Sequence, residues 1–324
     1  MRAVRVHELT GPGGLRVDEV PAPEPGPGEV AVDVKAAGVN FPEVLLSYGK
    51  YQFKPPPPFV PGGELAGVVA AVGAGVTSVS VGDRVAATML HGAFAERVVA
   101  PELAVVPLPD AVSFETGAIT LLTYATTYHA LVDRAALLPG ERLLVLGAAG
   151  GVGVAAVQLG KLLGARVIAA AGSPEKLEFC RAMGADDVAL YGTADFKDRL
   201  KELTHGDGAD VVYDAVGGPY AEPALRAIAW EGRYLVVGFA SGEIPRVPLN
   251  LALLKGCQIV GVFWGSFAMR EPERNRAHCA ALFEHVAAGR LAPHLDATFP
   301  FERAADALRR LEARAVRGKV ALVP

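Results

Sequence analysis

The strongest constraint on this 324-residue chain lies between residues 141 and 265, where short branched-aliphatic segments alternate with segments able to form helices. Because strands joined by helices pair in parallel, this rhythm predicts an α/β fold with a doubly wound parallel sheet. The predicted strands are 142–146, 166–171, 188–191, 211–214, 233–238 and 258–262. The predicted helices between them are 152–163, 174–183, 196–204, 219–229 and 249–255.

The first hundred residues predict a different kind of lobe. Prolines and glycines at 21–28 precede 29–35, which alternates with period two and is typical of a strand, and 64–72 is a short apolar strand. The proline run at 55–58 can form neither a helix nor a central strand, because proline lacks the amide donor. Short strands at close spacing indicate a compact β-rich lobe, which the final strand, 319–323, could rejoin.

Composition excludes several classes of protein. The net charge of −4 argues against a nucleic-acid-binding stripe or a basic membrane-surface patch. The apolar stretches are shorter than the roughly 20 residues of a membrane span, and the charged first residues do not form a signal peptide. Three widely separated cysteines make a disulfide framework improbable, so we expect a soluble cytoplasmic protein.

A glycine-rich loop follows the first strand of the alternating region. The strand runs into Ala148-Ala149-Gly150-Gly151-Val152-Gly153, and a helical stretch follows at once. In this setting backbone amides can approach a pyrophosphate at the start of the helix. Gly150 would allow that approach and Gly153 would allow the helix to pack on the strand, although Ala148 replaces the first glycine of the usual pattern. A packing role alone is the alternative, but the βαβ setting favours dinucleotide binding by residues 149–153.

The end of the second strand indicates which dinucleotide binds. A site for NAD usually places Asp or Glu there, and this chain has Gly172 and Ser173 instead, followed by Lys176. A serine hydroxyl and a lysine charge suit a 2′-phosphate, so the sequence predicts NADPH as the cofactor. The same residues would also serve an ordinary helix start, with Ser173 as the cap, and Glu175 weighs against a phosphate.

Seven ordered segments resemble the medium-chain dehydrogenase/reductase superfamily, and within it the zinc-free quinone oxidoreductases. They are 37–43, 48–51, 61–67, 81–85, 126–128, 148–153 and 318–320. The resemblance implies a GroES-like catalytic domain formed by residues 1–115 and 266–324, and a central Rossmann domain for NADP(H) at 116–265. It also implies a homodimer, since the apolar last strand could pair with its twin.

The resemblance bears on metal binding as well. Zinc-dependent relatives carry a cysteine and a histidine ligand where this chain has Asn40 and Gly63, and their four-cysteine structural lobe has no counterpart near residues 92–106. One histidine, His91, and Glu64 do not make a zinc site, and Glu64 is interpreted as a structural carboxylate. The sequence therefore predicts that no metal is used.

Further site residues are implied by the same resemblance. Asn40 would lie beside the nicotinamide, Thr126 would contact its carboxamide or ribose, and Lys319 would reach the cofactor unless it is a solvated residue of the tail. Tyr51 is the candidate proton donor, as in enoyl-thioester reductases of the superfamily, or else it packs against the proline loop. The remaining cofactor contacts implied are Tyr191, Phe239, Ala240, Val262, Phe263 and Trp264.

These features predict an NADPH-dependent reductase of quinones or other conjugated carbonyl compounds, acting on a small-molecule electron acceptor. Such acceptors need least help from a Lewis acid, because their oxygen gains charge remote from the carbon that is attacked. Two alternatives remain open. One is a trans-2-enoyl thioester reductase, with Arg270, Arg274 and Arg276 at its entrance, and the other is an NADPH-binding protein without catalytic activity.

Overall fold

The computed structural model describes all residues from 1 to 324 and divides into two compact units. The β-rich unit consists of Met1–Leu122 and Ala268–Pro324, and the parallel-sheet unit consists of Thr123–Phe267. The first unit is therefore built from both ends of the chain. No helix combines the length and the apolar character that crossing a membrane requires.

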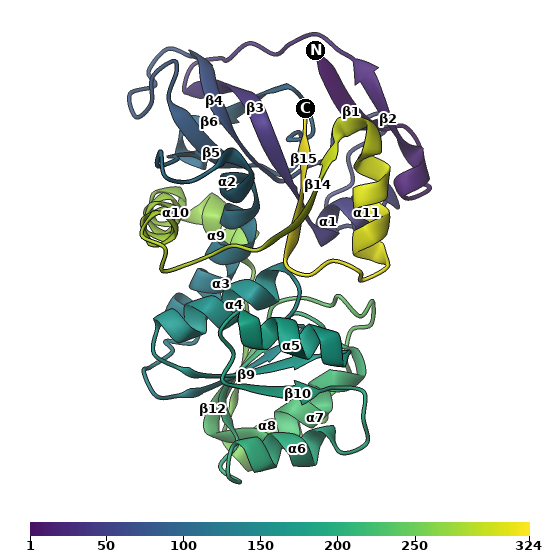
Figure 1. Cartoon of the computed structure of the whole chain (residues 1–324), viewed down its shortest axis with the longest axis vertical. Helices are drawn as coiled ribbons and strands as arrows, with labels where there is room; N and C mark the ends of the chain where they lie inside the picture. The colour runs from purple at the N-terminus through teal and green to yellow at the C-terminus, as the bar shows by residue number, and fades with distance from the viewer. The chain divides into compact units, whose positions relative to one another are not determined.

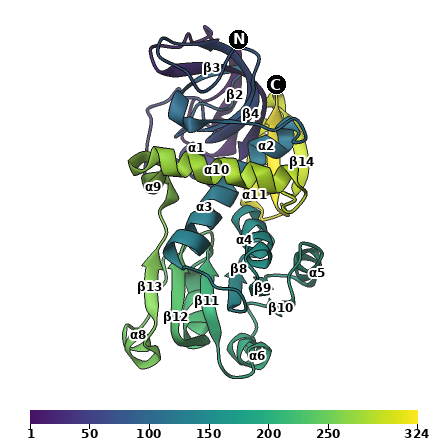
Figure 2. The ribbon, with the colours of Figure 1, turned by 90° about the vertical axis from the view of Figure 1, so that its left-hand side faces the viewer.

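The parallel-sheet unit contains one six-stranded sheet in the order β10-β9-β8-β11-β12-β13, with every neighbouring pair parallel. Figure 1 shows this sheet in the whole chain, and Figure 2 labels all six of its strands. The predicted doubly wound sheet is thus confirmed. The strand order reverses between β8 and β11, which is where ligands bind in such sheets. The strands are β8 (Arg142–Leu146), β9 (Arg166–Ala171), β10 (Asp187–Leu190), β11 (Ala209–Asp214), β12 (Ile228–Val236) and β13 (Gln258–Gly261).

Helices cover both faces of this sheet. Alternate residues of β8 point to opposite faces, so Leu144 joins a core formed with α6, α7 and α8, whereas Leu143 meets Gly160 of α4. Burial on both faces explains why the strands are continuously apolar rather than alternating. The helices are α4 (Gly151–Leu162), α5 (Pro174–Ala182), α6 (Phe196–Leu203), α7 (Ala221–Arg226) and α8 (Asn250–Lys255).

Two features of this unit differ from the sequence prediction. The predicted helix 219–229 is wrong at both ends. A 3₁₀ turn at Gly218–Tyr220 precedes α7, because Gly217 and Gly218 adopt positive φ, and β12 already begins at Ile228 with a register shift against β11. The segments Leu121–Ala125 and His129–Arg134 form π-helical turns on either side of α3 (Thr126–Tyr128), which no sequence pattern indicated.

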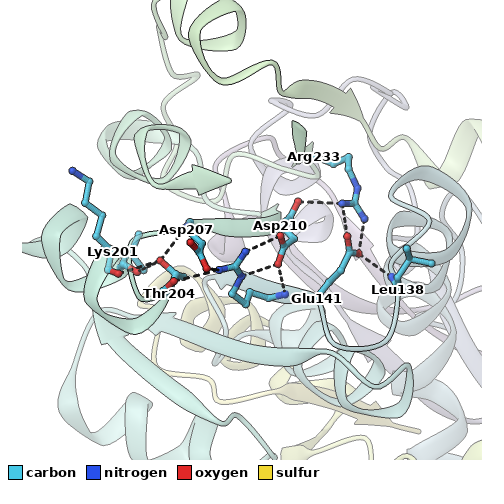
Figure 3. Close-up of polar contacts among 10 residues, drawn as sticks. Leu138, Glu141, Lys201, Thr204, Asp207, Asp210 and Arg233 are labelled. Atoms are coloured by element: carbon cyan, nitrogen blue, oxygen red, sulfur yellow. Dashed lines mark hydrogen bonds and ion pairs between the residues drawn. The ribbon is translucent and has the colours of Figure 1, made fainter. Parts of the chain in front are cut away.

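An arginine–carboxylate network, which we call the edge network, lies at the amino ends of the strands (Figure 3). Arg142 donates to Asp210 at 2.8 Å and to Asp207 at 3.0 Å. Arg233 donates to both oxygens of Glu141, at 2.6 and 2.7 Å. Paired guanidinium and carboxylate groups thus join the starts of β8 and β11 and the middle of β12.

The β-rich unit is organised around a seven-stranded sheet in the order β14-β15-β3-β4-β5-β7, with β6 also paired to β3. The terminal strand pairs antiparallel with β3 and parallel with β14, so the chain's end rejoins the first lobe. The strands are β3 (Glu29–Val39), β4 (Glu64–Val72), β5 (Arg84–Thr88), β6 (Arg97–Pro101), β7 (Val105–Pro107), β14 (Leu295–Pro300) and β15 (Lys319–Val323). A separate hairpin pairs β1 (Arg2–Val6) with β2 (Leu15–Glu19).

Four helices complete the fold of this unit (Figure 2). They are α1 (Phe41–Ser47), α2 (Phe114–Thr120), α10 (Pro272–Ala287) and α11 (Ala304–Glu312), and α9 (Trp264–Arg270) carries the chain from one unit to the other. Ser113 caps α2 by accepting a hydrogen bond from the Thr116 amide, as its sequence position predicts. The core is fully buried around Phe94, Leu65 and Phe301.

Candidate functional site

The turn between β8 and α4 has the backbone geometry of an anion site. Gly150 caps the helix in an extended conformation, and no side chain bonds to the first-turn amides. A Cβ atom on Gly153 would lie 2.2 Å from the Gly147 carbonyl oxygen, so only glycine allows the helix to start this close to the strand. Exposed amides and the helix dipole together attract a phosphate group. The structure therefore fits a pyrophosphate at residues 150–153.

The next strand end carries the predicted phosphate residues. Ser173 caps α5, and its hydroxyl accepts from the Lys176 amide at 3.4 Å. A hydrogen bond with the Ser173 side chain also lowers the pKa of the exposed Glu175 carboxyl. No acidic residue ends β9 itself, where Ala171 is followed by Gly172. Ser173 is thus a helix cap in this structure, and a phosphate contact from Ser173 or Lys176 remains a prediction.

Tyr191 follows β10 directly and lies against the end of β9. A Cβ atom on Gly172 would be 3.2 Å from the Tyr191 ring, so the two predicted residues are neighbours. The ring also packs on Tyr220, with centroids 4.3 Å apart. Two tyrosine rings, tilted by 34° to each other, therefore lie beside the end of β9.

The other predicted cofactor residues of this unit also follow strand ends or flank α4. Ala240 donates its amide to Ala215 after β11, and Val262 continues β13 by donating to Val236. Phe263 is 62% exposed, whereas Val262 is buried. Thr126 begins α3, which packs against α4. The predicted residues of the parallel-sheet unit thus gather at the carboxyl edge of the sheet or at the helix that begins there.

Asp214, the last residue of β11, is a site residue that sequence reasoning missed. Its buried carboxylate accepts from the amides of Val216 and Gly217, each at 2.8 Å, and from the Tyr234 hydroxyl at 2.5 Å. These bonds hold the loop that follows β11 at the carboxyl edge. The available signal was an acid at the end of an apolar strand, immediately before a turn with two glycines.

In the β-rich unit, four polar side chains form a buried cluster, which we call the lysine cluster: Asn40, Glu43, Glu64 and Lys319. Each is at most 5% exposed. The Lys319 ammonium donates to Glu64 at 2.7 Å and also to the Asn40 side-chain oxygen. The Asn40 amide nitrogen Nδ2 donates to Glu64 at 3.1 Å, and its backbone N–H donates to Glu43 at 2.7 Å. The cluster thus contains two carboxylic acids and one cation.

Burial raises the pKa of Glu43 to about 7, against the opposing charge of Lys319. The partial burial of Tyr51, together with the charge of Glu43, raises the pKa of its phenol and so makes it a weaker acid. Tyr51 is half-buried and packs against the small apolar cluster of Val6, Leu46 and Phe59. Tyr51 thus packs on apolar residues, and its role as a proton donor remains a prediction.

Lys319 was predicted to reach the cofactor. The structure places its ammonium inside the β-rich unit, where it also donates to the Val39 carbonyl at 3.0 Å, which gives it three protein acceptors. Any effect of Lys319 on a ligand would therefore act through Asn40.

The resemblance to zinc-dependent relatives predicts ligands at positions 40 and 63, where this chain has Asn40 and Gly63. A Cβ atom on Gly63 would lie 3.3 Å from a Glu43 oxygen, so this position borders the lysine cluster. No group of three or more histidine, cysteine, aspartate and glutamate side chains is placed to hold a metal ion.

A six-stranded doubly wound sheet with a glycine-rich turn, together with a β-rich unit formed from both chain ends, defines the two-domain class of medium-chain dehydrogenases. Residues 26–110 match the family model of the alcohol dehydrogenase GroES-like domain, and residues 151–280 match that of the zinc-binding dehydrogenases.

Individual relatives agree with this class. The chain is 39% identical to a quinone oxidoreductase-like protein 2 homolog of Nematostella vectensis, over 99% of the chain and 88% of that protein. It is 33% identical to human quinone oxidoreductase, over 95% and 92% of the two chains. The Escherichia coli quinone oxidoreductase complexed with NADPH has a TM-score of 0.93 at 31% identity, with both chains fully covered. The chain belongs to the quinone oxidoreductase branch of the medium-chain dehydrogenase/reductase superfamily, and is an oxidoreductase of that family.

Proposed function

We propose that this protein is an NADPH-dependent reductase of quinones or other conjugated carbonyl compounds, and that it transfers hydride directly and without a metal ion. The observation that carries the proposal is the uncapped glycine turn at the start of α4, where Gly153 lies too close to the strand to carry a side chain. A relative crystallised with NADPH supports the choice of cofactor.

The residues of the parallel-sheet unit fit a phosphorylated dinucleotide. Amides at 150–153 would hold the pyrophosphate, and Ser173 and Lys176 would hold the 2′-phosphate, with Gly172 leaving room beside Tyr191. The chemistry that the bound cofactor supplies is a hydride. Glu175 is the one carboxylate on this rim that opposes an anion, and its bond with Ser173 would have to give way.

The chain's own contribution to the reaction is to hold a donor toward the acceptor's oxygen, which gains negative charge as the acceptor is reduced. Asn40 is the proposed donor and Tyr51 the proposed proton source. Metal ligation is not part of the proposal, because an amide and a glycine stand at the two ligand positions, and neither supplies the nitrogen or sulfur donor that zinc prefers.

The second candidate is reduction of a trans-2-enoyl thioester. It is favoured by the presence of Tyr51, whose phenol carries a proton that an enolate could take, although the raised pKa makes this phenol a weaker acid than a free tyrosine. The arginines proposed as an entrance give it less support, because Arg274 pairs with Glu271 at 3.1 Å on its own helix.

Steady-state oxidation of NADPH tests the proposal directly. We expect turnover with 1,4-benzoquinone and 9,10-phenanthrenequinone, and a much lower kcat/KM with crotonyl-CoA. A preference for the thioester would replace the first candidate by the second. No oxidation with any acceptor, combined with NADPH binding in calorimetry, would identify a binding protein instead. Extensive dialysis against a chelator should leave the rate unchanged, and a loss that zinc restores would overturn the metal-free mechanism.

A Lys176→Ala variant tests the choice between the two dinucleotides. Losing one cation at a phosphate should raise the KM for NADPH about tenfold, equivalent to about 1.4 kcal/mol, and leave the KM for NADH unchanged. Lys197→Ala, in the exposed pair with Asp198, is the matched control. An equal change in the KM values for NADPH and NADH would show that Lys176 does not contact the 2′-phosphate.

We also propose a homodimer formed through the last strand of the sheet. β13 has only one strand neighbour, β12, and exposes Ile259, and the adjoining α8 leaves Leu253 81% exposed. An uncovered edge with apolar neighbours is a pairing surface. Light scattering should give twice the chain mass, and Ile259→Lys should give a monomer, whereas Leu90→Ser on the β-rich unit should not.

A further inference from the structure

The lysine cluster fixes the orientation of an amide. A lysine ammonium carries three hydrogens and no acceptor, and all three have partners here: Val39, Asn40 and Glu64. Because an ammonium can only donate, the atom of Asn40 that faces Lys319 must be the side-chain oxygen. This assignment follows from chemistry and not from the shape of the amide, whose two ends are otherwise hard to tell apart.

Glu64 fixes the other end of the same amide. Its Oε1 accepts from Lys319 and from Asn40 Nδ2, and its Oε2 accepts from the Leu122 amide at 2.9 Å. Every neighbour donates to this carboxylate, so the atom of Asn40 that faces it must be nitrogen. Lys319 and Glu64 therefore select one of the two orientations of Asn40, and they do so from strands β15 and β4, at nearly opposite ends of the sequence.

One hydrogen of this amide is not used by either contact. Nδ2 carries two hydrogens, and the bond to Glu64 takes one of them. We propose that Lys319 and Glu64 are a matched pair of positioning residues, which hold Asn40 so that its second amide hydrogen serves the acceptor oxygen that gains charge during reduction. This inference rests on the proposed reductase function. It assigns the pair no contact with substrate, so neither residue is a catalytic residue.

The surroundings of Asn40 make this arrangement sensitive to charge. Glu43 of α1 accepts from the backbone N–H of Asn40, and Glu64 of β4 and Lys319 of β15 bond to the Asn40 side chain. The charge of Glu43 also raises the pKa of Tyr51. Removing Lys319 alone leaves two buried acids without a cation, which endangers the fold. The informative variant is therefore Lys319→Met combined with Glu64→Gln. It removes the charges of both positioning residues and allows the side-chain amide of Asn40 to flip between its two orientations.

Side-chain amide NMR tests the orientation without any turnover. The chain has only three asparagines, Asn40, Asn250 and Asn275, so selective ¹⁵N labelling gives three NH₂ pairs, and Asn40→Ala assigns the first. We expect the Asn40 pair to show one hydrogen protected from exchange and shifted downfield by the carboxylate. In the double variant this protection should be lost. A wild-type Asn40 pair that exchanges as fast as that of the exposed Asn250 would overturn the inference.

A mutant cycle tests whether the pair acts through Asn40. Asn40→Ala should lower kcat about a hundredfold, as loss of one oxyanion donor does, with the KM for NADPH within about twofold. The double variant should lower kcat at least tenfold by itself, and less than about twofold further in the Asn40→Ala background. Equal effects in both backgrounds, or wild-type kcat in the double variant, would reduce the pair to a structural role. Lys161→Met, which breaks an exposed pair with Asp186, is the control for loss of a lysine.

The two readouts separate this inference from the proposed function. In one outcome no acceptor is reduced, yet the Asn40 hydrogen is protected in the wild type and loses its protection in the double variant. The reductase proposal then fails. The orientation of the amide is correct but has no catalytic purpose, so the inference as stated is overturned. If quinones are reduced and the cycle is additive, only the inference fails.

Discussion

The edge network and the lysine cluster are both ionic, and they differ in how far water reaches their charged groups. In the edge network two guanidinium groups face three carboxylates, those of Asp207, Asp210 and Glu141, and the side chains retain access to water, with Arg142 21% and Asp210 23% exposed. In the lysine cluster one ammonium serves two acids, and all three groups are buried. Both arrangements hold one acid more than they hold cations, and what differs between them is the access of water to the charges.

The pKa values follow this difference. At the edge network burial acts to raise the pKa of Asp210, but hydrogen bonds from Arg142 outweigh it and the net pKa is lowered. In the lysine cluster burial outweighs the charge of Lys319, and the pKa of Glu43 rises to about 7. A lowered pKa means that ionisation stabilises the fold, and a raised one means that ionisation strains it. Partly hydrated ion pairs at a sheet end thus serve stability, whereas a buried acid with a raised pKa is typical of a functional site.

Removing the only cation of the lysine cluster should have the largest effect. Lys319→Met leaves Glu43 and Glu64 buried without a counter-charge, and we expect the free energy of unfolding to fall by about 4 kcal/mol at pH 8. At pH 5.5 the loss should be smaller, because Glu43 is then protonated and only one uncompensated carboxylate remains. Urea unfolding at the two pH values measures this. An equal loss at both would mean that the two acids do not share the lysine.

Glu43→Gln should come next, and it changes the pH dependence of stability. The pKa of Glu43 is about 7 in the folded protein and 4.5 without the fold, so the native state holds this proton more tightly. Its stabilising effect is complete below pH 4.5 and is lost as the pH rises to 7, a change of about 3 kcal/mol.

The comparison of the two proteins isolates this one group. We expect the stability of Glu43→Gln relative to wild type to rise by that amount between pH 4.5 and 7, because other groups cancel in the difference. Chemical denaturation across this range is the measurement. Parallel curves for the two proteins would place the pKa of Glu43 at its ordinary value.

The parts of the molecule also differ in how far the sequence predicts them. The doubly wound sheet could be predicted because each strand and helix is a local pattern, and the glycine turn at 147–153 lies within one βαβ unit. The bounds of the helix at 219–229 could not be predicted in this way. Gly217 and Gly218 adopt positive φ and shorten the helix at its start, and the pairing of Ile228 with β11 begins the next strand early. Pairing between strands is not a local property.

The lysine cluster is the clearest case of what a sequence pattern leaves out. Asn40 and Lys319 are separated by 279 positions and meet only because β15 pairs with β3. The sequence offered one signal, which is that Lys319 and Glu64 are charged residues within apolar strands and must find partners when buried. It placed Lys319 near the site but could not say that the lysine points at an asparagine, because that depends on the packing of three strands.

Asp210→Asn probes the edge network and should have a moderate effect. It removes the acceptor of a two-point bond from Arg142, and we expect a loss of about 2 kcal/mol at pH 7 with kcat and KM unchanged. The pKa of Asp210 is lowered in the fold, so its stabilising effect is present above its ordinary pKa of 3.8 and is lost as the pH falls further. The variant and the wild type should therefore converge in acid, opposite to Glu43→Gln. A change in KM for NADPH would mean that the edge network also shapes the cofactor site.

The smallest effect should come from an exposed pair on the same unit, which tests whether exposure or pairing decides the value of an ion pair. Arg226 and Glu222 lie one helical turn apart on α7, 2.6 Å from each other, with side chains 45% and 38% exposed. Arg226→Gln keeps the helix propensity and should cost only about 0.4 kcal/mol in urea unfolding, because water screens both charges. The cost should vanish in 1 M salt, where the Debye length is about 3 Å. A loss as large as that of Asp210→Asn would show that pairing distance alone sets stability here, and the contrast between half-buried and exposed charges would fail.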